Sequence, residues 1–455
     1  MALQAPPEWG IEPVPQKHRL LGFVDYFALW SSLGVGLLVL LAGTLLVPGL
    51  GLGSAFLAII IGTLIGNLLL ALAGVVGSDH AIPTMVMLRP VLGIRGSYLP
   101  TLFNFIQLIG WGAFEVIIMA QAANGISERL LGFSNYPLWA LLFALWCTLL
   151  AIGGPLMVVR QWLEKFAVWL VYGISIYLTW YLFAHYDVGS LLRAPGTGEL
   201  PFWLAVDLVV AMPISWMPLV ADYNRFARRS GSAFWGTYLG YLVANIWFYG
   251  LGALFVLALG TSDLIPAILA VAGGWIALVL ILVDETDNAF ADIYSAAVSS
   301  QNVFPRARQW WLAPIIGGIC FLLAVTVPIA QYENFLFLIG SVFSPLFGIL
   351  AADYFLLRKR HYDMDELYRP RGRYWYSQGI NGWAILAWLL GAVFFQMANP
   401  WLVAAYWPVW AEIVPAALTT LGGSIPAFLV ALLLYWLLAT CVGLRQRLPK
   451  ATSGR

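Results

Sequence analysis

The stretch Ile281–Ser300 reads ILVDETDNAFADIYSAAVSS and carries four carboxylates, Asp284, Glu285, Asp287 and Asp292, within an apolar run. Only 10% of the chain is charged, so this concentration of acids needs a cause. At about 100° per residue, the polar side chains that share one arc are Asp284, Glu285, Asn288, Asp292, Ser295 and Ser299, with Asp287 roughly 60° off it. The stretch predicts a helix with a polar stripe toward a wet cavity and lipid on its other side.

The composition indicates a polytopic membrane protein. Of 455 residues, 61% are hydrophobic, and the mean hydropathy is +0.84, whereas soluble domains are about 45–50% apolar. The polar, proline-rich start predicts no cleavable signal peptide. A net charge of +1 gives no sign of a nucleic-acid partner. Without metal-ligand spacing or a glycine-rich phosphate loop, we expect no cofactor, no resident metal and no ATPase.

Twelve segments are candidates for crossing a bilayer, which takes about 20 apolar residues. In chain order they are Phe23–Leu46, Ser54–Val76, Tyr98–Ile126, Leu138–Met157, Trp162–Phe183, Phe202–Val220, Trp235–Leu259, Ile265–Val298, Pro314–Ile329, Phe335–Leu356, Ile380–Met397 and Ile425–Val442. The aromatic, proline-bearing range Ala398–Gly423 is predicted to be an interfacial loop.

The basic residues divide sharply between the two sides of this topology. With the N-terminus inside, 21 of the 23 Lys and Arg residues fall on the inner side, and only Arg129 and Arg193 fall outside. Such an excess marks the cytoplasmic side. We therefore expect a multi-pass protein of the cell's inner (plasma) membrane, with cytoplasmic tails at 1–22 and 443–455 and a basic cytoplasmic loop at 358–379.

Two candidate spans are interrupted. The first contains Ser31–Gly36 (SSLGVG) and the sixth contains Pro213–Pro218 (PISWMP). Proline removes a helix hydrogen bond and glycine is a weak helix former, and freed backbone in a bilayer is tolerated only beside protein or a water-filled cavity. Helix packing could explain either break alone. Two breaks five spans apart are typical of a transporter site between inverted repeats.

The same repeat pairs span eight with span three, where Gly110–Glu115 reads GWGAFE. Trp111 and Glu115 are four residues apart and share a helix face. They suit a flat ligand, because an indole stacks on a ring and a carboxylate accepts N–H bonds. The alternative is a buried, protonated Glu115 bonded to a neighbouring helix. We expect spans one, three, six and eight to converge at one cavity.

The oxygens of span eight suggest a coupling ion. Hydroxyls and carboxylates, including Thr286 and Asp287, supply hard ligands for a small cation, or a buried aspartate could carry a proton. The alternative is that Asp284 and Glu285 only line the entrance.

Four motifs together resemble the nucleobase–cation symporter-1 family, which comprises permeases for purines, cytosine, uracil, allantoin, hydantoin and thiamine precursors. They are Asp25–Trp30 (DYFALW), Ala81–Thr84 with Arg89–Ser97 (AIPT and RPVLGIRGS), Gly110–Trp111 with Glu115, and Asp222–Phe226 (DYNRF). The resemblance runs from about Gly22 to Lys359 and is weaker beyond.

The resemblance implies an all-α, LeuT-like fold. Its two inverted repeats of five helices would span 23–183 and 202–357, and two extra helices with an external loop would occupy 380–442. It also implies alternating access, cation symport of a small heterocycle across the lipid bilayer, and a monomer that suffices.

By resemblance, the residues that contact substrate are Gly34, Trp111, Phe114, Glu115, Ser215, Trp216, Asn288 and Asp292. Those near the coupling cation are Ser32, Leu33, Gly36, Val283, Asp284, Thr286 and Asp287, with Na⁺ at Thr286 and Asp287. A second aromatic wall on span six would fall near Pro213, whereas the nearest aromatic residue is Trp216.

Two departures from the family pattern bear on the ligands. Glu115 falls where many members have Gln, and a carboxylate favours a ligand with two donors. The expected substrate is therefore a nucleobase such as cytosine, or an aminopyrimidine such as hydroxymethylpyrimidine. Acids in place of hydroxyls and amides on span eight leave both Na⁺ and H⁺ open.

Other function classes fit less well. An intramembrane enzyme could use Glu115 and a span-eight acid as an acid/base pair, but no His, Ser or metal partner is suitably spaced. An ion channel would need repeated charged rings. An amino-acid carrier of the same fold is the nearest alternative, although acids near the site would repel a carboxylate.

Overall fold

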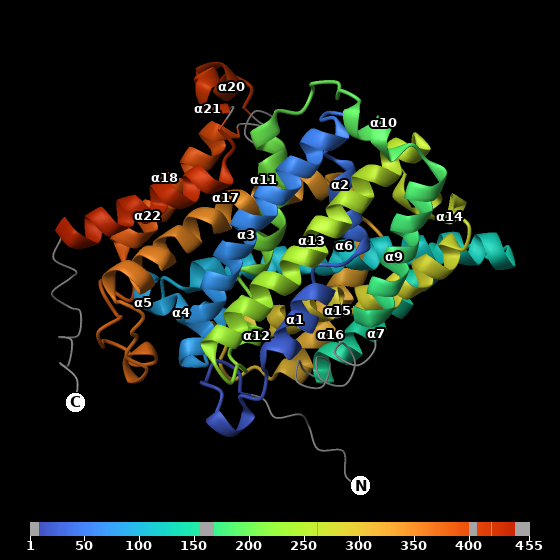
Figure 1. Ribbon diagram of the computed structural model, residues 1–455. Coiled ribbons are helices and arrows are strands. Elements are labelled where there is room, and N and C mark those ends of the chain that lie inside the picture. The colour runs from blue at the N-terminus through green and yellow to red at the C-terminus, as the bar shows by residue number, and fades with distance from the viewer. Residues whose placement is uncertain (1–8, 154–167, 262, 400–406, 420, 442–455) are drawn as a thin grey trace, which may run out of the picture.

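The computed structural model describes residues 9–153, 168–261, 263–399, 407–419 and 421–441, and these ranges are helical apart from loops and two isolated bridges (Figure 1). The longer helices are α1 (Phe23–Ser32), α2 (Leu37–Thr44), α3 (Leu52–His80), α6 (Tyr98–Leu131), α7 (Tyr136–Gly153), α9 (Val168–His185), α11 (Phe202–Trp216), α13 (Ser230–Leu259), α15 (Gly274–Gln301), α16 (Gln309–Ala324), α17 (Tyr332–Ala351), α18 (Gly382–Ala398) and α22 (Ser424–Cys441). The short segments are η1 (Gln16–His18), α4 (Thr84–Met87), α5 (Arg89–Leu92), α10 (Val188–Arg193), α12 (Val220–Asn224), α14 (Leu264–Ala270), η3 (Ile329–Gln331), η4 (Ala352–Leu357), η5 (Asp365–Leu367), α20 (Val409–Ile413) and α21 (Ala416–Thr419).

Each of the twelve predicted spans coincides with a helix or with two successive helices. Among the described residues, six helices are long and apolar enough to cross a membrane, and α1 with α2 forms a bent seventh. The apolar helices α11, α16 and α18 are shorter. The count of twelve crossings therefore stays a prediction. Parts of the predicted spans Leu138–Met157 and Trp162–Phe183, of the predicted loop Ala398–Gly423 and of the predicted tail 1–22 lie outside the described residues, as do the end of the span Ile425–Val442 and the whole predicted tail 443–455.

The eighth predicted span departs from the structure in two ways. It is not one helix, because α14 ends before Gly273, whose φ of +69° is a left-handed conformation that favours glycine. The prediction that the other side of this helix faces lipid is also wrong. Every residue from Asp284 to Ser299 is buried, since α6, α7, α9 and α16 surround α15. Apolar side chains look alike in sequence whether they face lipid or another helix.

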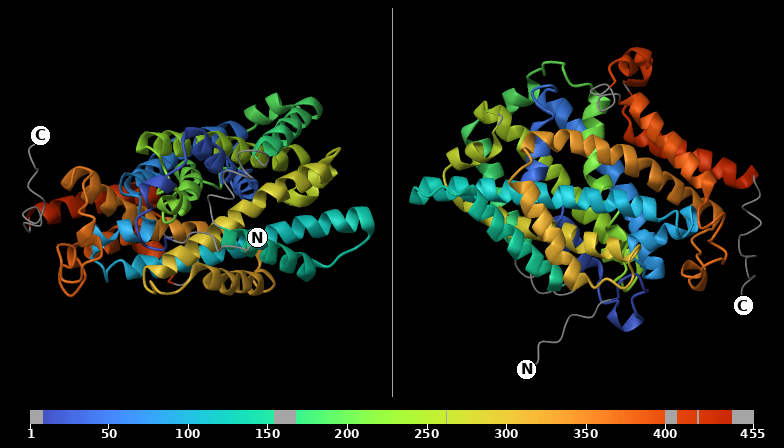
Figure 2. Two further views of the ribbon diagram at one scale, coloured as in Figure 1. Left: turned by 90° about the horizontal axis from the view of Figure 1, so that it is seen from below. Right: turned by 180° about the vertical axis from the view of Figure 1, so that it is seen from behind.

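The helix packing has the exchange symmetry of two repeats. Helix α1 packs on α13, and its counterpart α11 packs on α3, while α3 and α13 lie side by side (Figure 1). Helices α6 and α15 pack together along the centre, and both contact α7 and α16 (Figure 2). Helices α17, α18 and α22 pack on one another at one side of the bundle. The limits proposed for the repeats stay predictions.

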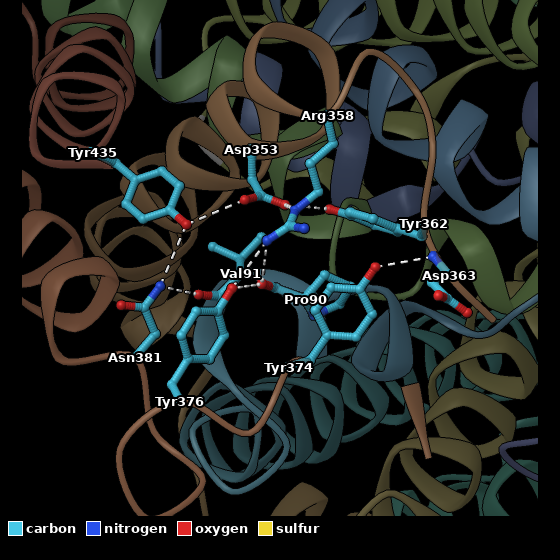
Figure 3. Close-up of polar contacts among 10 residues, drawn as sticks. All are labelled: Pro90, Val91, Asp353, Arg358, Tyr362, Asp363, Tyr374, Tyr376, Asn381 and Tyr435. Atoms are coloured by element: carbon cyan, nitrogen blue, oxygen red, sulfur yellow. Dashed lines mark hydrogen bonds and ion pairs between the residues drawn. The ribbon is translucent and has the colours of Figure 1, made fainter. Parts of the chain in front are cut away.

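A buried ion pair ties the predicted basic loop to the bundle (Figure 3). Arg358 Nε donates to Asp353 Oδ2 at 2.7 Å, and the two side chains are 6% and 1% exposed. The hydroxyls of Tyr362 and Tyr435 also donate to this carboxylate, at 3.1 and 3.2 Å. The guanidinium lies 5.0 Å from the ring centroid of Tyr374. A buried carboxylate thus receives three donors, two from the basic loop and one from α22.

The same loop is anchored to the segment before α6. Tyr376 donates to the Pro90 carbonyl at 2.5 Å, and Asn381 Nδ2 donates to the Val91 carbonyl at 2.7 Å. The carbonyl of Gly379 accepts the backbone N–H of Arg95 at 2.9 Å. Loops predicted to lie on the inner side therefore contact one another.

We predict that Arg358→Ala lowers the free energy of unfolding by about 3–5 kcal/mol, because it leaves the buried Asp353 carboxylate without its cation. Unfolding of the purified protein in detergent measures the loss. Arg369→Ala is the matched control, since its ion pair with Glu366 is 71% and 18% exposed and such surface pairs contribute about 0–1 kcal/mol. Equal losses in the two variants would contradict the prediction.

Candidate functional site

The predicted break in the first span is confirmed, and α15 satisfies its backbone. Helices α1 and α2 meet at 57°. The N–H of Leu37 donates to Glu285 Oε2 at 2.7 Å, and Asn288 Nδ2 donates to the Val35 carbonyl at 3.1 Å. A side chain on Gly36 would meet Glu285 Oε1 at 2.9 Å. Two residues of the polar stripe thus replace the hydrogen bonds that a continuous helix would have made.

A second group of oxygens lies at the same break. Ser32 Oγ donates to Asp284 Oδ1 at 2.6 Å and also lies near the Asp287 carboxylate. Within the described ranges, Asp284 Oδ2 and both oxygens of Asp287 have no hydrogen-bond partner of normal geometry. Both aspartates are 1% exposed. Three of the residues predicted near a cation are thus brought together.

The predicted break in the sixth span is also confirmed, between α11 and α12, and here α6 supplies the partners. Gln107 Nε2 donates to the Ser215 carbonyl at 3.0 Å, and Asn104 Nδ2 donates to the Pro218 carbonyl at 3.2 Å. Asn104 also donates to Ser299 Oγ at 2.8 Å, which joins α6 to α15. Each break is therefore satisfied by the acid-bearing helix of the other repeat.

The sequence analysis missed Asn104 and Gln107. Their spacing to Trp111 and Glu115 is three, four and four residues, which places all four side chains on one face of α6. This polar stripe was a usable signal, parallel to the one on α15.

Glu115 lies next to the acidic stripe. Its carboxyl group is a neighbour of the Glu285 carboxyl group where α6 packs on α15. Asp292 faces Gly112 on α6, about one turn before Glu115. The structure therefore joins the predicted acids of spans three and eight in one buried cluster.

Aromatic rings of α17 pack against the predicted stacking residues. The centroid of Trp111 lies 5.3 Å from Phe335 and 5.7 Å from Tyr332, both edge to face. Phe114 lies 5.3 and 5.6 Å from the same two rings. Tyr332 donates to the Leu38 carbonyl in α2 at 3.1 Å. Phe335 and Tyr332, which lie at the start of the tenth span and just before it, were missed because no local pattern distinguishes them from other packing aromatics.

Three other predicted substrate residues pack elsewhere. Trp216 lies 6.1 Å from Trp30 in an edge-to-face pair. The Ser215 hydroxyl donates to the Met212 carbonyl at 2.6 Å. A side chain on Gly34 would meet Ala244 of α13 at 2.9 Å. In this structure they support the breaks and the helix packing.

Thr286 and Val283 lie on the far side of α15. The Thr286 hydroxyl donates to the Val283 carbonyl at 2.9 Å, and both residues line an apolar cavity of about 580 Å³ between α6, α7 and α15. Residues two positions apart on a helix point in directions about 200° apart. Thr286 therefore points away from Asp284 and from Ser32, which bonds to Asp284. Leu33 continues α1 by a bond from its N–H to the Leu29 carbonyl.

A second cavity, of about 720 Å³, lies between α2, α6 and α14. Its lining includes Ile118 and Gln121, one and nearly two turns beyond Glu115 on α6, and Leu41, one turn beyond Leu37 on α2. Polar groups such as Glu128 are also part of its lining. This cavity is a candidate entry path to the acidic cluster.

Comparisons with known proteins identify relatives along most of the chain. The model of a family described as permease for cytosine/purines, uracil, thiamine, allantoin matches residues 13–409. A hydantoin permease of Microbacterium maritypicum is 26% identical over 398 residues, covering 82% of this chain and 81% of the relative. A cytosine permease of Escherichia coli (strain K12) is 25% identical over 381 residues, covering 77% and 81%.

Among solved structures, Mhp1, a nucleobase–cation-symport-1 family transporter in a closed conformation with bromovinylhydantoin bound, superposes with a TM-score of 0.80. It is 21% identical and covers 98% of each chain. At that identity the match establishes the fold, and it confirms the predicted LeuT-like architecture.

We predict that Gly36→Ala destabilises the fold by about 1–3 kcal/mol, because the added methyl group displaces Glu285 from the Leu37 N–H. Thermal unfolding in detergent measures the effect. The matched control is Gly318→Ala in α16, where no atom lies within 4 Å of the added carbon, and it should cost nothing. A Gly36→Ala protein as stable as the control would refute this role of Glu285.

Proposed function

We propose that this chain, which belongs to the family of permeases for cytosine/purines, uracil, thiamine and allantoin, imports a planar nitrogen heterocycle together with a cation by alternating access. One observation carries the proposal: the two broken helices and the two acid-bearing helices meet at a single buried centre. Interrupted helices of two repeats that converge in this way are how such transporters hold substrate and coupling ion.

The substrate that we favour is a nucleobase such as cytosine or an aminopyrimidine such as hydroxymethylpyrimidine. The Trp111 indole offers a flat face next to a carboxyl group whose Oε2 atom, on Glu115, is buried without a partner in the described structure. An amino group and a ring N–H would satisfy such acceptors. The hydantoin and cytosine permeases among the relatives also carry small nitrogen heterocycles by their names.

For the coupling cation, Na⁺ or H⁺, we favour the oxygens of Ser32, Asp284 and Asp287 at the first break. All three are buried, and they include the free carboxylate oxygens described above. Hard oxygen ligands of this kind suit a small cation. Thr286, expected from the resemblance, turns toward the lateral cavity and is less well placed.

The orientation that we propose places both termini in the cytoplasm of a cell whose inner membrane holds the protein as a monomer. The excess of basic residues on one side supports it, as do the contacts between loops of the same predicted side.

An amino-acid carrier is less well supported. Such a protein needs free backbone N–H groups at the first break to bind the substrate carboxylate. Here the N–H of Leu37 already donates to Glu285, and the surrounding carboxyl groups would repel an anion.

Uptake into proteoliposomes tests the proposed function. The expected result is accumulation of at least one of labelled cytosine, hydroxymethylpyrimidine, uracil, hypoxanthine, allantoin and hydantoin under a Na⁺ or H⁺ gradient. Glu115→Gln, which supplies a donor where the carboxylate only accepts, should shift the preference among these by about tenfold. Glu199→Gln, the same change on an exposed loop, should shift nothing. No uptake of any of the six would refute the function.

A second experiment tests the cation site. Asp287→Asn removes a carboxylate from the first break, so uptake should lose most of its dependence on the driving gradient while substrate binding persists. External Na⁺ is replaced by choline at fixed pH, and pH is then varied at fixed Na⁺. A variant with the wild-type dependence on both ions would exclude Asp287 from coupling.

A further inference from the structure

We propose that the substrate itself carries a positive charge: a planar aromatic cation whose charge is spread over N–H groups, as in an amidinium or an aminopyridinium ion. This inference rests on the proposed transport function and narrows the substrate of the same site.

The first argument is the charge of the centre. Five carboxyl groups lie there, none more than 4% exposed: Glu115, Asp284, Glu285, Asp287 and Asp292. No ion pair found among the described residues includes any of them. An acidic site without a basic partner favours a ligand that brings the opposite charge, because Coulomb interactions are strong where water is excluded.

The buried arginines are engaged elsewhere. Arg89 donates to Asn302, Arg225 donates to the Gly10 carbonyl, and Arg358 pairs with Asp353. These three buried arginines therefore do not neutralise the carboxyl groups of the centre.

The second argument is independent of charge and concerns donors and acceptors. Buried acceptors without a partner, among the residues described, include Glu115 Oε2, Glu285 Oε1 and Asn288 Oδ1, whereas the indole N–H of Trp111 is an unpartnered donor beside them. The amide donors are already used, since Asn288 Nδ2 holds the first break and Gln107 Nε2 holds the second. A ligand rich in N–H groups completes this set, and one rich in carbonyl groups does not.

The geometry also distinguishes an organic cation from a metal ion. In the described part of the chain, no group of three or more His, Cys, Asp or Glu residues is placed to hold a metal. Four of the five carboxyl groups instead follow one side of α15 over more than two turns, from Asp284 to Asp292. Charge arranged along a surface matches a delocalised, flat cation better than a point charge. Trp111 adds a ring face to the same site, and aromatic faces attract cations.

Benzamidine and benzamide form the test pair, because they have nearly the same shape and differ in an amidinium against a neutral amide. Isothermal titration of the purified full chain should show benzamidine binding at least tenfold more tightly. Glu115→Gln and Asp292→Asn should each remove most of this preference by weakening the binding of benzamidine. Glu199→Gln again serves as the control, and thermal unfolding checks that each variant is folded.

The outcomes separate this inference from the function on which it rests. If cytosine or another neutral heterocycle binds tightly and benzamidine binds no better than benzamide, the inference of a cationic substrate is wrong and the proposed transport function is unaffected. A preference that survives both substitutions in folded protein would place the cation outside this site and also overturn the inference. Binding of neither the neutral heterocycles nor benzamidine would overturn both.

Discussion

The arrangement of this molecule depends on hydrogen bonds to backbone that two broken helices leave free. In the hydrocarbon region, each unsatisfied N–H or carbonyl group costs several kcal/mol, so the breaks can exist only where other helices serve them. Helix α15 supplies Glu285 and Asn288 to the first break, and α6 supplies Asn104 and Gln107 to the second. Each repeat therefore binds the other at its helix break, and the candidate site lies where these contacts meet.

Much of this site was predictable from sequence, because its signals are strong in an apolar chain. Glycine and proline marked both breaks, and the carboxylates marked α6 and α15, since charges in a bilayer are rarely incidental. The family resemblance then predicted a fold that the solved structures confirm. The sequence could not show which neighbouring helix or cavity each side chain faces. The family resemblance placed Thr286 near the cation, whereas packing turns it toward a lateral cavity.

The remaining errors share this origin. A polar stripe reveals which face of a helix avoids lipid, but an apolar face is silent about its neighbour, so α15 was expected at the lipid boundary although it is enclosed. Likewise, Tyr332 and Phe335 of α17 pack edge to face against Trp111. Contacts between segments more than two hundred residues apart arise from tertiary packing, which local periodicity does not encode.

The exchange of hydrogen-bond partners between repeats also imposes an order on biosynthesis. Leu37 and Val35 are translated 248 and 253 residues before Glu285 and Asn288, which at about 5–20 residues per second is a delay of roughly 10–50 s. Asn104 and Gln107, in contrast, precede the second break by 114 and 108 residues. The second broken helix thus finds its partners already synthesised, whereas the first must wait for α15. During this delay the backbone groups at the first break lack the hydrogen bonds that they have in the folded protein.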